Sequence, residues 1–202
     1  MKIKSIFFDI GGVLAIEDRK KQYSELSKIM GFNLDEFEKL RSEKVELFSR
    51  GKISEEEYLS YFSKRFNLNY EKLRNNWVNL AKKYYKLNQE VYETIRKLSK
   101  RYLLGTLTNI IPIHNKIRKE EDPYKFFKIK LLSFEQGYRK PDKEFYNLIL
   151  EKTKLKANEI VFIDDHEPYL EPARMLGMKT ILFKNNKNLT KELKDLGVIL
   201  SP

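Results

Sequence analysis

Five short runs of consecutive apolar residues constrain the fold of this chain more than any other feature. They are rich in Ile, Leu and Phe and cover residues 3–10, 102–109, 129–134, 159–165 and 179–183. Strands that are apolar at consecutive positions are covered on both faces, as in a parallel sheet between two layers of helices. Segments of helical character lie between the runs, at residues 88–101, 141–153 and 168–177. This alternation predicts a doubly wound α/β core.

Residues 16–88 interrupt the alternation. They have the pattern of consecutive helices, expected near residues 17–30, 34–49, 54–66 and 70–86. Ser54 and Glu57 have the spacing of a capping box at the start of the third helix. We therefore predict a core domain formed by residues 1–15 and 89–202, and an inserted α-helical domain formed by residues 16–88.

The chain is basic, with 40 Lys and Arg against 29 Asp and Glu and a formal net charge of +11. Such a charge raises the question of a nucleic-acid partner. The basic residues are interspersed with acidic ones along the whole chain, which is typical of a solvated, ion-paired surface rather than a stripe that follows a phosphate backbone. We therefore expect no nucleic-acid partner.

The same composition suggests where the protein works. No apolar stretch approaches the roughly 20 residues that a membrane span needs, and Lys2 and Lys4 interrupt the apolar start, so we expect no membrane partner and a cytoplasmic location. Cysteine is absent, which excludes disulfides and thiolate metal sites. Many Lys and Glu residues with no Cys also fit a thermophilic source.

Polar side chains stand where the predicted strands end. In an open parallel sheet the ligand site lies beyond these carboxyl ends. The residues at or just after the ends, including one lysine further along a loop, are Asp9, Gly11, Gly12, Thr108, Asn109, Lys140, Asp164 and Asp165. One edge of the sheet should therefore collect three carboxylates, a hydroxyl and an amine.

This set of groups suits phosphoryl transfer. A carboxylate such as that of Asp9 can attack phosphorus and divide one difficult step into two easier ones. Mg²⁺ prefers hard oxygen ligands, which Asp9, Asp164 and a backbone carbonyl near Gly11 supply. Thr108, Lys140 and backbone N–H groups are suited to hold phosphoryl oxygens, and Asn109, next to Thr108, is a further candidate for substrate binding. The two glycines let the substrate come close to the loop.

Four motifs in this order resemble those of the haloacid dehalogenase-like hydrolases. They are "FFDIGGVL", "TLTN", "GYRKPDKEFY" and "VFIDD", and the helical insertion after the first is similar to the C1 cap of subfamily IA. The resemblance implies a Rossmann-like core with a cap, a Mg²⁺ cofactor and hydrolysis of a small phosphorylated metabolite. By position it implies that Asp9 is the nucleophile, that Thr108 and Lys140 bind the phosphoryl group, and that Asp164 and Asp165 lie at the metal.

One position departs from the family pattern. Most phosphatases of the family carry a second Asp, as general acid and base, where this chain has Gly11; the branch similar to glucose-1-phosphate phosphatase also has Gly there. General acid–base help is typically worth about 10²–10⁴-fold. The enzyme then favours leaving groups that need little protonation, such as anomeric sugar phosphates or aryl phosphates, or another group substitutes, either a water or a carboxylate such as that of Glu17 or Asp18. A third alternative is a protein that binds a phosphorylated ligand or partner with little turnover.

A fourth alternative is a 2-haloacid dehalogenase. Those members of the family also lack the second Asp, but they usually place an aromatic residue there and use no metal. Gly11 and the retained Asp164–Asp165 pair disfavour this alternative.

The substrate is expected to meet the helical insertion as well. Cap domains supply substrate contacts when they close and exclude water. The basic candidates for contact with an anionic substrate are Arg41, Lys44, Arg50 and Lys52. The sequence fits a monomer or a homodimer.

Overall fold

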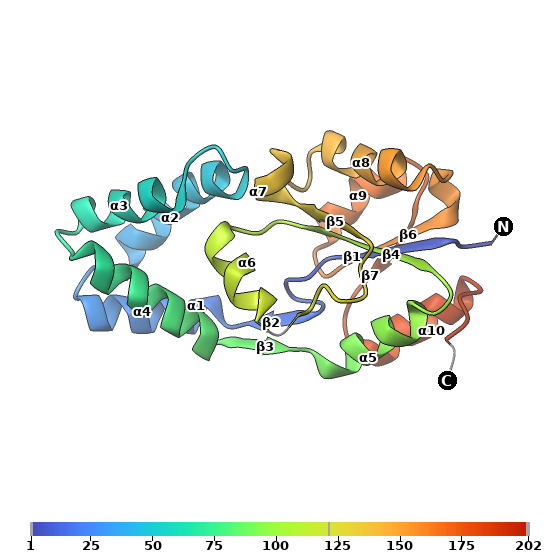
Figure 1. Cartoon of the computed structure of the whole chain (residues 1–202), viewed down its shortest axis with the longest axis horizontal. Coiled ribbons are helices and arrows are strands. Elements are labelled where there is room, and N and C mark those ends of the chain that lie inside the picture. Colours follow the sequence, from blue (N-terminus) through green and yellow to red (C-terminus); the bar gives the residue numbers. More distant parts are fainter. Residues whose placement is uncertain (1, 121, 201–202) are drawn as a thin grey trace.

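The computed structural model describes residues 2–120 and 122–200, so residues 1, 121 and 201–202 of the predicted core domain lie outside the described part. Five parallel strands form one sheet in the order β5-β4-β1-β6-β7 (Figure 1). Their bounds are Ser5–Phe8 (β1), Leu103–Thr108 (β4), Ile129–Leu132 (β5), Ile160–Asp164 (β6) and Lys179–Leu182 (β7). Each strand falls within one of the apolar runs, and the predicted doubly wound α/β core is confirmed.

Helices cover both faces of this sheet. One pair lies below the sheet in Figure 1, α5 (Gln89–Leu98) and α10 (Asn186–Asp195), and the other above it, α8 (Lys143–Thr153) and α9 (Glu167–Met175). Ile6, Phe7 and Phe8 of β1 are all fully buried. Ile6 and Phe8 belong to the apolar cluster of α5 and α10, whereas Phe7 belongs to that of α8 and α9. Side chains alternate between faces along a strand, so a strand covered on both sides must be apolar at every position.

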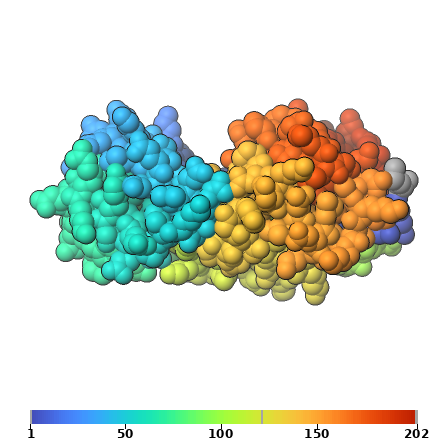
Figure 2. Space-filling view, turned by 90° about the horizontal axis from the view of Figure 1, so that it is seen from above, coloured from blue at the N-terminus to red at the C-terminus, as the bar shows by residue number. Residues whose placement is uncertain are grey.

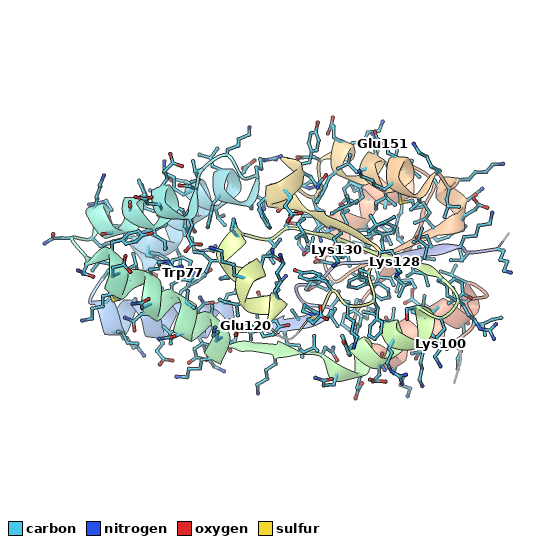
Figure 3. All side chains as sticks on the ribbon, viewed as in Figure 1. Trp77, Lys100, Glu120, Lys128, Lys130 and Glu151 are labelled. Carbon is cyan, nitrogen blue, oxygen red and sulfur yellow. The ribbon has the colours of Figure 1, made fainter. Side chains whose placement is uncertain are left out.

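Residues 16–88 contain four consecutive helices. They are α1 (Arg19–Met30), α2 (Leu34–Ser49), α3 (Glu55–Arg65) and α4 (Tyr70–Lys83). Trp77 is fully buried among them (Figure 3). Its ring lies 5.5 Å from that of Tyr23, 5.8 Å from Phe37 and 5.9 Å from Tyr58, measured between centroids. The helices therefore have an aromatic core of their own, and we call residues 16–88 the helical insertion.

The capping box at the third of these helices is present as predicted. The side chain of Ser54 accepts a hydrogen bond from the N–H of Glu57 (3.1 Å), and the Glu57 carboxylate accepts one from the N–H of Ser54 (2.7 Å). Local side-chain chemistry of this kind is readable from sequence because both partners lie within one turn.

A two-stranded ribbon replaces the predicted helix ends on both sides of the insertion. Strands β2 (Ala15–Glu17) and β3 (Tyr85–Leu87) pair antiparallel, with Glu17 opposite Tyr85. The prediction placed residue 17 and residues 85–86 in helices, which is wrong. The ribbon forms between segments about 70 residues apart, so no local pattern indicates it. It carries both connections between the insertion and the sheet domain.

Helix α6 (Pro112–Lys119) is a second element that the sequence did not predict. Ile111, Ile113 and Ile117 join the aromatic core of the helical insertion, although they follow β4 in the chain. This helix therefore lies between the two parts of the molecule (Figure 1). The remaining elements are α7 (Ser133–Gln136) and the 3-10 turn at Ala157–Glu159.

Besides the apolar contact of α6, a polar contact joins the helical insertion to the sheet domain. The guanidinium of Arg50, at the end of α2, pairs with the carboxylate of Asp142, with Nη2 3.1 Å from Oδ1. The space-filling view shows the two parts as separate masses that meet at a narrower waist (Figure 2). We propose that residues 16–88 act as a cap over the edge of the sheet. None of the described helices is long and apolar enough to cross a membrane.

Candidate active site

Asp9, Lys140 and Asp164 form a buried cluster at the carboxyl ends of the strands. The N–H of Asp9 donates to the carbonyl of Ile163 (2.8 Å), which places Asp9 beside Asp164. Nζ of Lys140 lies 2.9 Å from Oδ2 of Asp9 and 2.6 Å from Oδ2 of Asp164. The exposed fractions are 7 % for Asp9, 1 % for Lys140 and 0 % for Asp164. The ammonium is thus clamped between two carboxylates.

Asn109 fixes the backbone that carries this lysine. Its Oδ1 accepts a hydrogen bond from the N–H of Lys140 (2.8 Å), and its Nδ2 donates to the carbonyl of Lys140 (3.0 Å). A carboxamide with both groups engaged holds a loop in one position. The sequence predicted that Asn109 binds substrate, and the structure adds this positioning contact.

Three carboxylates meet at this edge. Asp9, Asp164 and Asp165 each offer an oxygen atom, and these atoms lie within 4.8 Å of one another. Burial and the neighbouring Asp9 carboxylate raise the pKa of Asp164 to about 6, against the effect of the Lys140 ammonium, and burial also raises the pKa of Asp165. For Lys140, burial lowers the pKa, but Asp9 and Asp164 outweigh it and hold the pKa above its usual range. Hard oxygen ligands around a negative centre fit Mg²⁺.

Gly12 makes room for the third carboxylate. Its φ is +77°, in the left-handed region, and a Cβ atom at this position would lie 1.9 Å from Oδ2 of Asp165. Only glycine combines this backbone conformation with this approach. Of the two glycines in the first motif, Gly12 is therefore required for a steric reason: a side chain there would collide with Asp165.

Gly12→Ala is expected to displace the Asp165 carboxylate and to weaken divalent-cation affinity by roughly 10- to 100-fold, the range seen when groups that orient metal ligands are lost. Isothermal titration with Mg²⁺ measures this. Gly31→Ala is the matched control, because Gly31 also has positive φ (+75°) but a Cβ there meets nothing within 4 Å. Equal Mg²⁺ affinity in the two variants would contradict the steric role of Gly12.

A cavity of about 440 Å³ opens over this cluster. The predicted site residues that line it are Asp9, Gly11, Gly12, Asn109, Lys140 and Asp165. Thr108 does not border this cavity. Its Oγ1 is buried and has no hydrogen-bond partner within residues 2–120 and 122–200. Arg139 and Arg19 also line the cavity, although the sequence predicted no role at the site for either.

Position 11 faces a buried ion pair. A Cβ atom on Gly11 would lie 3.5 Å from Nη2 of Arg118, which comes from α6 and is 1 % exposed. Nε of Arg118 donates to Oε1 of Glu17 (2.7 Å), and Nη2 lies 2.6 Å from the same oxygen. Arg19 holds the other oxygen of Glu17, with Nε at 2.9 Å from Oε2. The space beside Gly11 is thus bounded by an arginine, not by an acid.

Neither proposed substitute for the missing acid is suited to proton donation at neutral pH. Burial raises the pKa of Glu17, but Arg118 and Arg19 outweigh it and hold the pKa far below its usual range. Asp18 caps α1, and its bonds to Lys21 lower its pKa as well. Both carboxylates therefore stay ionised, which argues against Glu17 or Asp18 replacing the second Asp as the proton donor.

The four basic candidates of the helical insertion lie in different surroundings. Arg41 lines a second cavity beside the first. Arg50 is engaged by Asp142 and Glu46, and Nζ of Lys44 lies 4.7 Å from the centroid of the Tyr61 ring. Lys52 is exposed. Only Arg41 borders a cavity next to the buried cluster.

Known proteins resemble this chain in sequence and in fold. Bifunctional epoxide hydrolase 2 of Mus musculus is 41 % identical over 68 residues, which are 34 % of this chain and 12 % of that protein. The D-ribitol-5-phosphate phosphatase of Bacteroides thetaiotaomicron is 24 % identical over 202 residues, covering 95 % of this chain and 97 % of that one. A HAD family enzyme from the same organism superposes with a TM-score of 0.81 at 24 % identity, over 91 % of this chain and 95 % of the other.

The family model carries the assignment. The model of the haloacid dehalogenase-like hydrolases matches residues 3–177. The match includes all four motifs and the helical insertion between the first and the second. The resemblance predicted from the motifs is therefore confirmed: this chain belongs to the haloacid dehalogenase-like hydrolases.

Proposed function

We propose that this protein is a Mg²⁺-dependent phosphatase that hydrolyses a small phosphorylated metabolite through an aspartyl-phosphate on Asp9. The observation that carries the proposal is the charge of the cluster at the carboxyl ends of the strands. Three carboxylates, those of Asp9, Asp164 and Asp165, face one ammonium, that of Lys140. Three negative charges minus one positive charge leave a surplus of two, which a divalent cation balances.

The comparisons support the metal and the substrate class. A HAD family enzyme from Bacteroides thetaiotaomicron, with a TM-score of 0.78 at 24 % identity, was solved in complex with magnesium and inorganic phosphate. A magnesium complex of the enzyme has a TM-score of 0.79 at 25 % identity. The relative named D-ribitol-5-phosphate phosphatase supports a small phosphorylated metabolite as the substrate class.

The reaction follows from the positions of the side chains. A carboxylate oxygen of Asp9 attacks phosphorus, a bond forms between them, and the bond from phosphorus to the leaving oxygen breaks. Nζ of Lys140 lies beside the attacking carboxylate and neutralises phosphoryl charge. The family resemblance assigns Thr108 to the phosphoryl group; its Oγ1 has no hydrogen-bond partner among the described residues, but Thr108 does not line the cavity. Bound Mg²⁺ supplies charge neutralisation of the transferring group. Water then attacks phosphorus and releases phosphate and the free Asp9 carboxylate.

Leaving groups that need little protonation are the substrates that this site favours. Gly11 offers no proton, and Glu17 is held ionised by Arg118 and Arg19. We therefore infer that the leaving oxygen takes its proton from water. Without a general acid, the hydrolysis of anomeric sugar phosphates and aryl phosphates is slowed little. The hydrolysis of primary alkyl phosphates loses most of the rate that a general acid contributes.

The test is hydrolysis of para-nitrophenyl phosphate, glucose 1-phosphate and glucose 6-phosphate by the purified protein, with Mg²⁺ and with EDTA. Turnover that requires Mg²⁺ and that favours the first two over the third is the expected result. Binding of Mg²⁺ and phosphate with no turnover of any ester would instead favour a protein that binds a phosphorylated ligand.

Restoring an acid at position 11 is not expected to restore acid catalysis. In Gly11→Asp the new carboxylate lies within reach of Arg118, which lowers its pKa and keeps it ionised. We expect a gain below about 10-fold for glucose 6-phosphate, well short of the roughly 10²-fold minimum for general acid–base catalysis. The double variant Gly11→Asp/Arg118→Met removes the charge that holds the acid ionised. A gain confined to the double variant, with Arg118→Met alone as control, supports this reading; a full gain in Gly11→Asp contradicts it.

A further inference from the structure

A second cavity of about 180 Å³ adjoins the catalytic one. The two cavities share Arg19, Asn109 and Arg139 in their walls, so they are direct neighbours. The helical insertion supplies Tyr23 of α1 and Arg41 of α2, and the sheet domain supplies Arg139. The second cavity therefore lies where the insertion meets the sheet domain.

The walls of this second cavity carry positive charge without matching negative charge. Three arginines line it, and its lining contains no Asp or Glu. Among the described residues, neither Arg41 nor Arg139 has a carboxylate within ion-pair distance. Arg19 is paired with Glu17, but Glu17 is also paired with Arg118, so this one carboxylate serves two arginines.

Arg41 is held in place and yet has an unsatisfied donor. Its guanidinium lies over the ring of Tyr23, 4.8 Å from the centroid. Its Nε is buried and has no hydrogen-bond partner in the part of the chain that the structure describes. Leaving a buried charged donor without an acceptor is costly, so such a group points to an acceptor that the protein itself does not provide.

A cavity elsewhere in the molecule shows the opposite arrangement. It has a volume of about 330 Å³ and lies between α4 and α6, near Glu120 in Figure 3. Arg74 and Lys116 both pair with Glu55, each at 2.9 Å, and Lys82 pairs with Glu120 at 2.7 Å. Each of these three cations has a carboxylate partner, although Glu55 serves two of them. Cations without a carboxylate partner, such as Arg41 and Arg139, are therefore not a feature of every cavity of this basic chain.

We propose that the second cavity binds an additional anionic group of the substrate, so that the substrate is a phosphate monoester that also carries a carboxylate or a second phosphate. Arginine is suited to both anions because its planar fork donates two parallel hydrogen bonds. The phosphoryl group lies at Asp9, and the second anion lies among Arg19, Arg41 and Arg139. This proposal rests on the proposed phosphatase function, whose site holds the first anion.

Binding to the Asp9→Asn variant in the presence of Mg²⁺ tests the proposal independently of turnover. The probes are pairs that share the phosphate and differ in the distal group: glycerol 3-phosphate against 3-phosphoglycerate, and sorbitol 6-phosphate against 6-phosphogluconate. Glucose 1,6-bisphosphate, compared with glucose 6-phosphate, tests a second phosphate. At least one doubly anionic probe is expected to bind about 10-fold or more tightly than its partner, as for a hydrogen bond to a charged group. The tighter class identifies the anion.

Variants at Arg41 assign this preference to the second cavity. Arg41→Gln in the Asp9→Asn background is expected to reduce the preference to below about threefold, and Arg41→Lys, which keeps the charge, to restore part of it. Arg65→Gln is the matched control, because Arg65 lies on the outer surface of the insertion, paired with Glu36, and is expected to retain the full preference. Equal affinities within every pair, no binding of any doubly anionic probe, or a preference that survives Arg41→Gln would each overturn the proposal.

Kinetics of the otherwise unchanged enzyme provide a second readout. The ratio of kcat/KM for the doubly anionic ester to that for its singly anionic partner is expected to fall about 10-fold or more in Arg41→Gln, largely through KM. A ratio unaffected by the substitution contradicts the proposal. Failure to hydrolyse any ester would count against the phosphatase function, while the affinities measured with Asp9→Asn would still decide whether a second anion is bound.

Discussion

Asp9→Asn is expected to lower Mg²⁺-dependent turnover of para-nitrophenyl phosphate by at least about 10⁴-fold, the range found when a nucleophile is removed. The amide is nearly isosteric with the carboxylate but is a far weaker nucleophile. Lys140 keeps its 2.6 Å contact with Asp164 in this variant. The loss of one charge also relieves repulsion among the three clustered carboxylates. The expected phenotype is therefore loss of chemistry with the fold retained.

Asp18→Asn is the matched control for this loss. Asp18 is also an aspartate of the first motif region, but it caps α1 at the surface, and asparagine is an equally good cap. Turnover should stay within about twofold of the unmodified enzyme, since surface changes of this kind have small effects. Thermal melts and circular dichroism of both variants establish folding. More than about one-tenth of the activity remaining in Asp9→Asn would show that Asp9 is not the nucleophile.

The parts of this molecule that the sequence predicts are those whose cause is local or periodic. The consecutive apolar residues Ile6, Phe7 and Phe8 indicate a strand that is covered on both faces. In such a strand every side chain is buried, whichever face of the sheet it lies on. Asp9 and Asp164 end neighbouring strands, so parallel pairing alone brings them together. The resemblance of the motifs to the family adds the expected roles of Asp9 and Asp164. The parallel register of β1 with β6 is the physical reason that these two residues lie side by side.

The parts that the sequence did not predict depend on partners far along the chain. Glu17 and Arg118 form their ion pair across 101 residues. "NKIRKEED" is full of charge and is typical of a solvated surface, yet Arg118 within it is 1 % exposed. The β2–β3 ribbon likewise exists only once both ends of the insertion lie side by side. These long-range contacts determine the surroundings of Gly11. The presence of Arg118 beside this position therefore follows from the fold and not from the local sequence.

Lys140→Met is expected to lower the free energy of unfolding by about 3–5 kcal/mol in EDTA, the cost of leaving a buried ion pair without one partner. The ammonium group of Lys140 lies between the carboxylates of Asp9 and Asp164. The Lys140 side chain is 0 % exposed, so water cannot take the place of the ammonium in the variant. Mg²⁺ should recover part of the loss, because a cation that binds the folded state raises its stability. Urea unfolding of this variant and of the exposed control Lys143→Met, each with and without Mg²⁺, measures both effects. A loss below about 1 kcal/mol, as expected for a surface substitution, would mean that Lys140 does not stabilise the buried carboxylates. The argument that three carboxylates and one ammonium leave a charge for a divalent cation to balance would then fail as well.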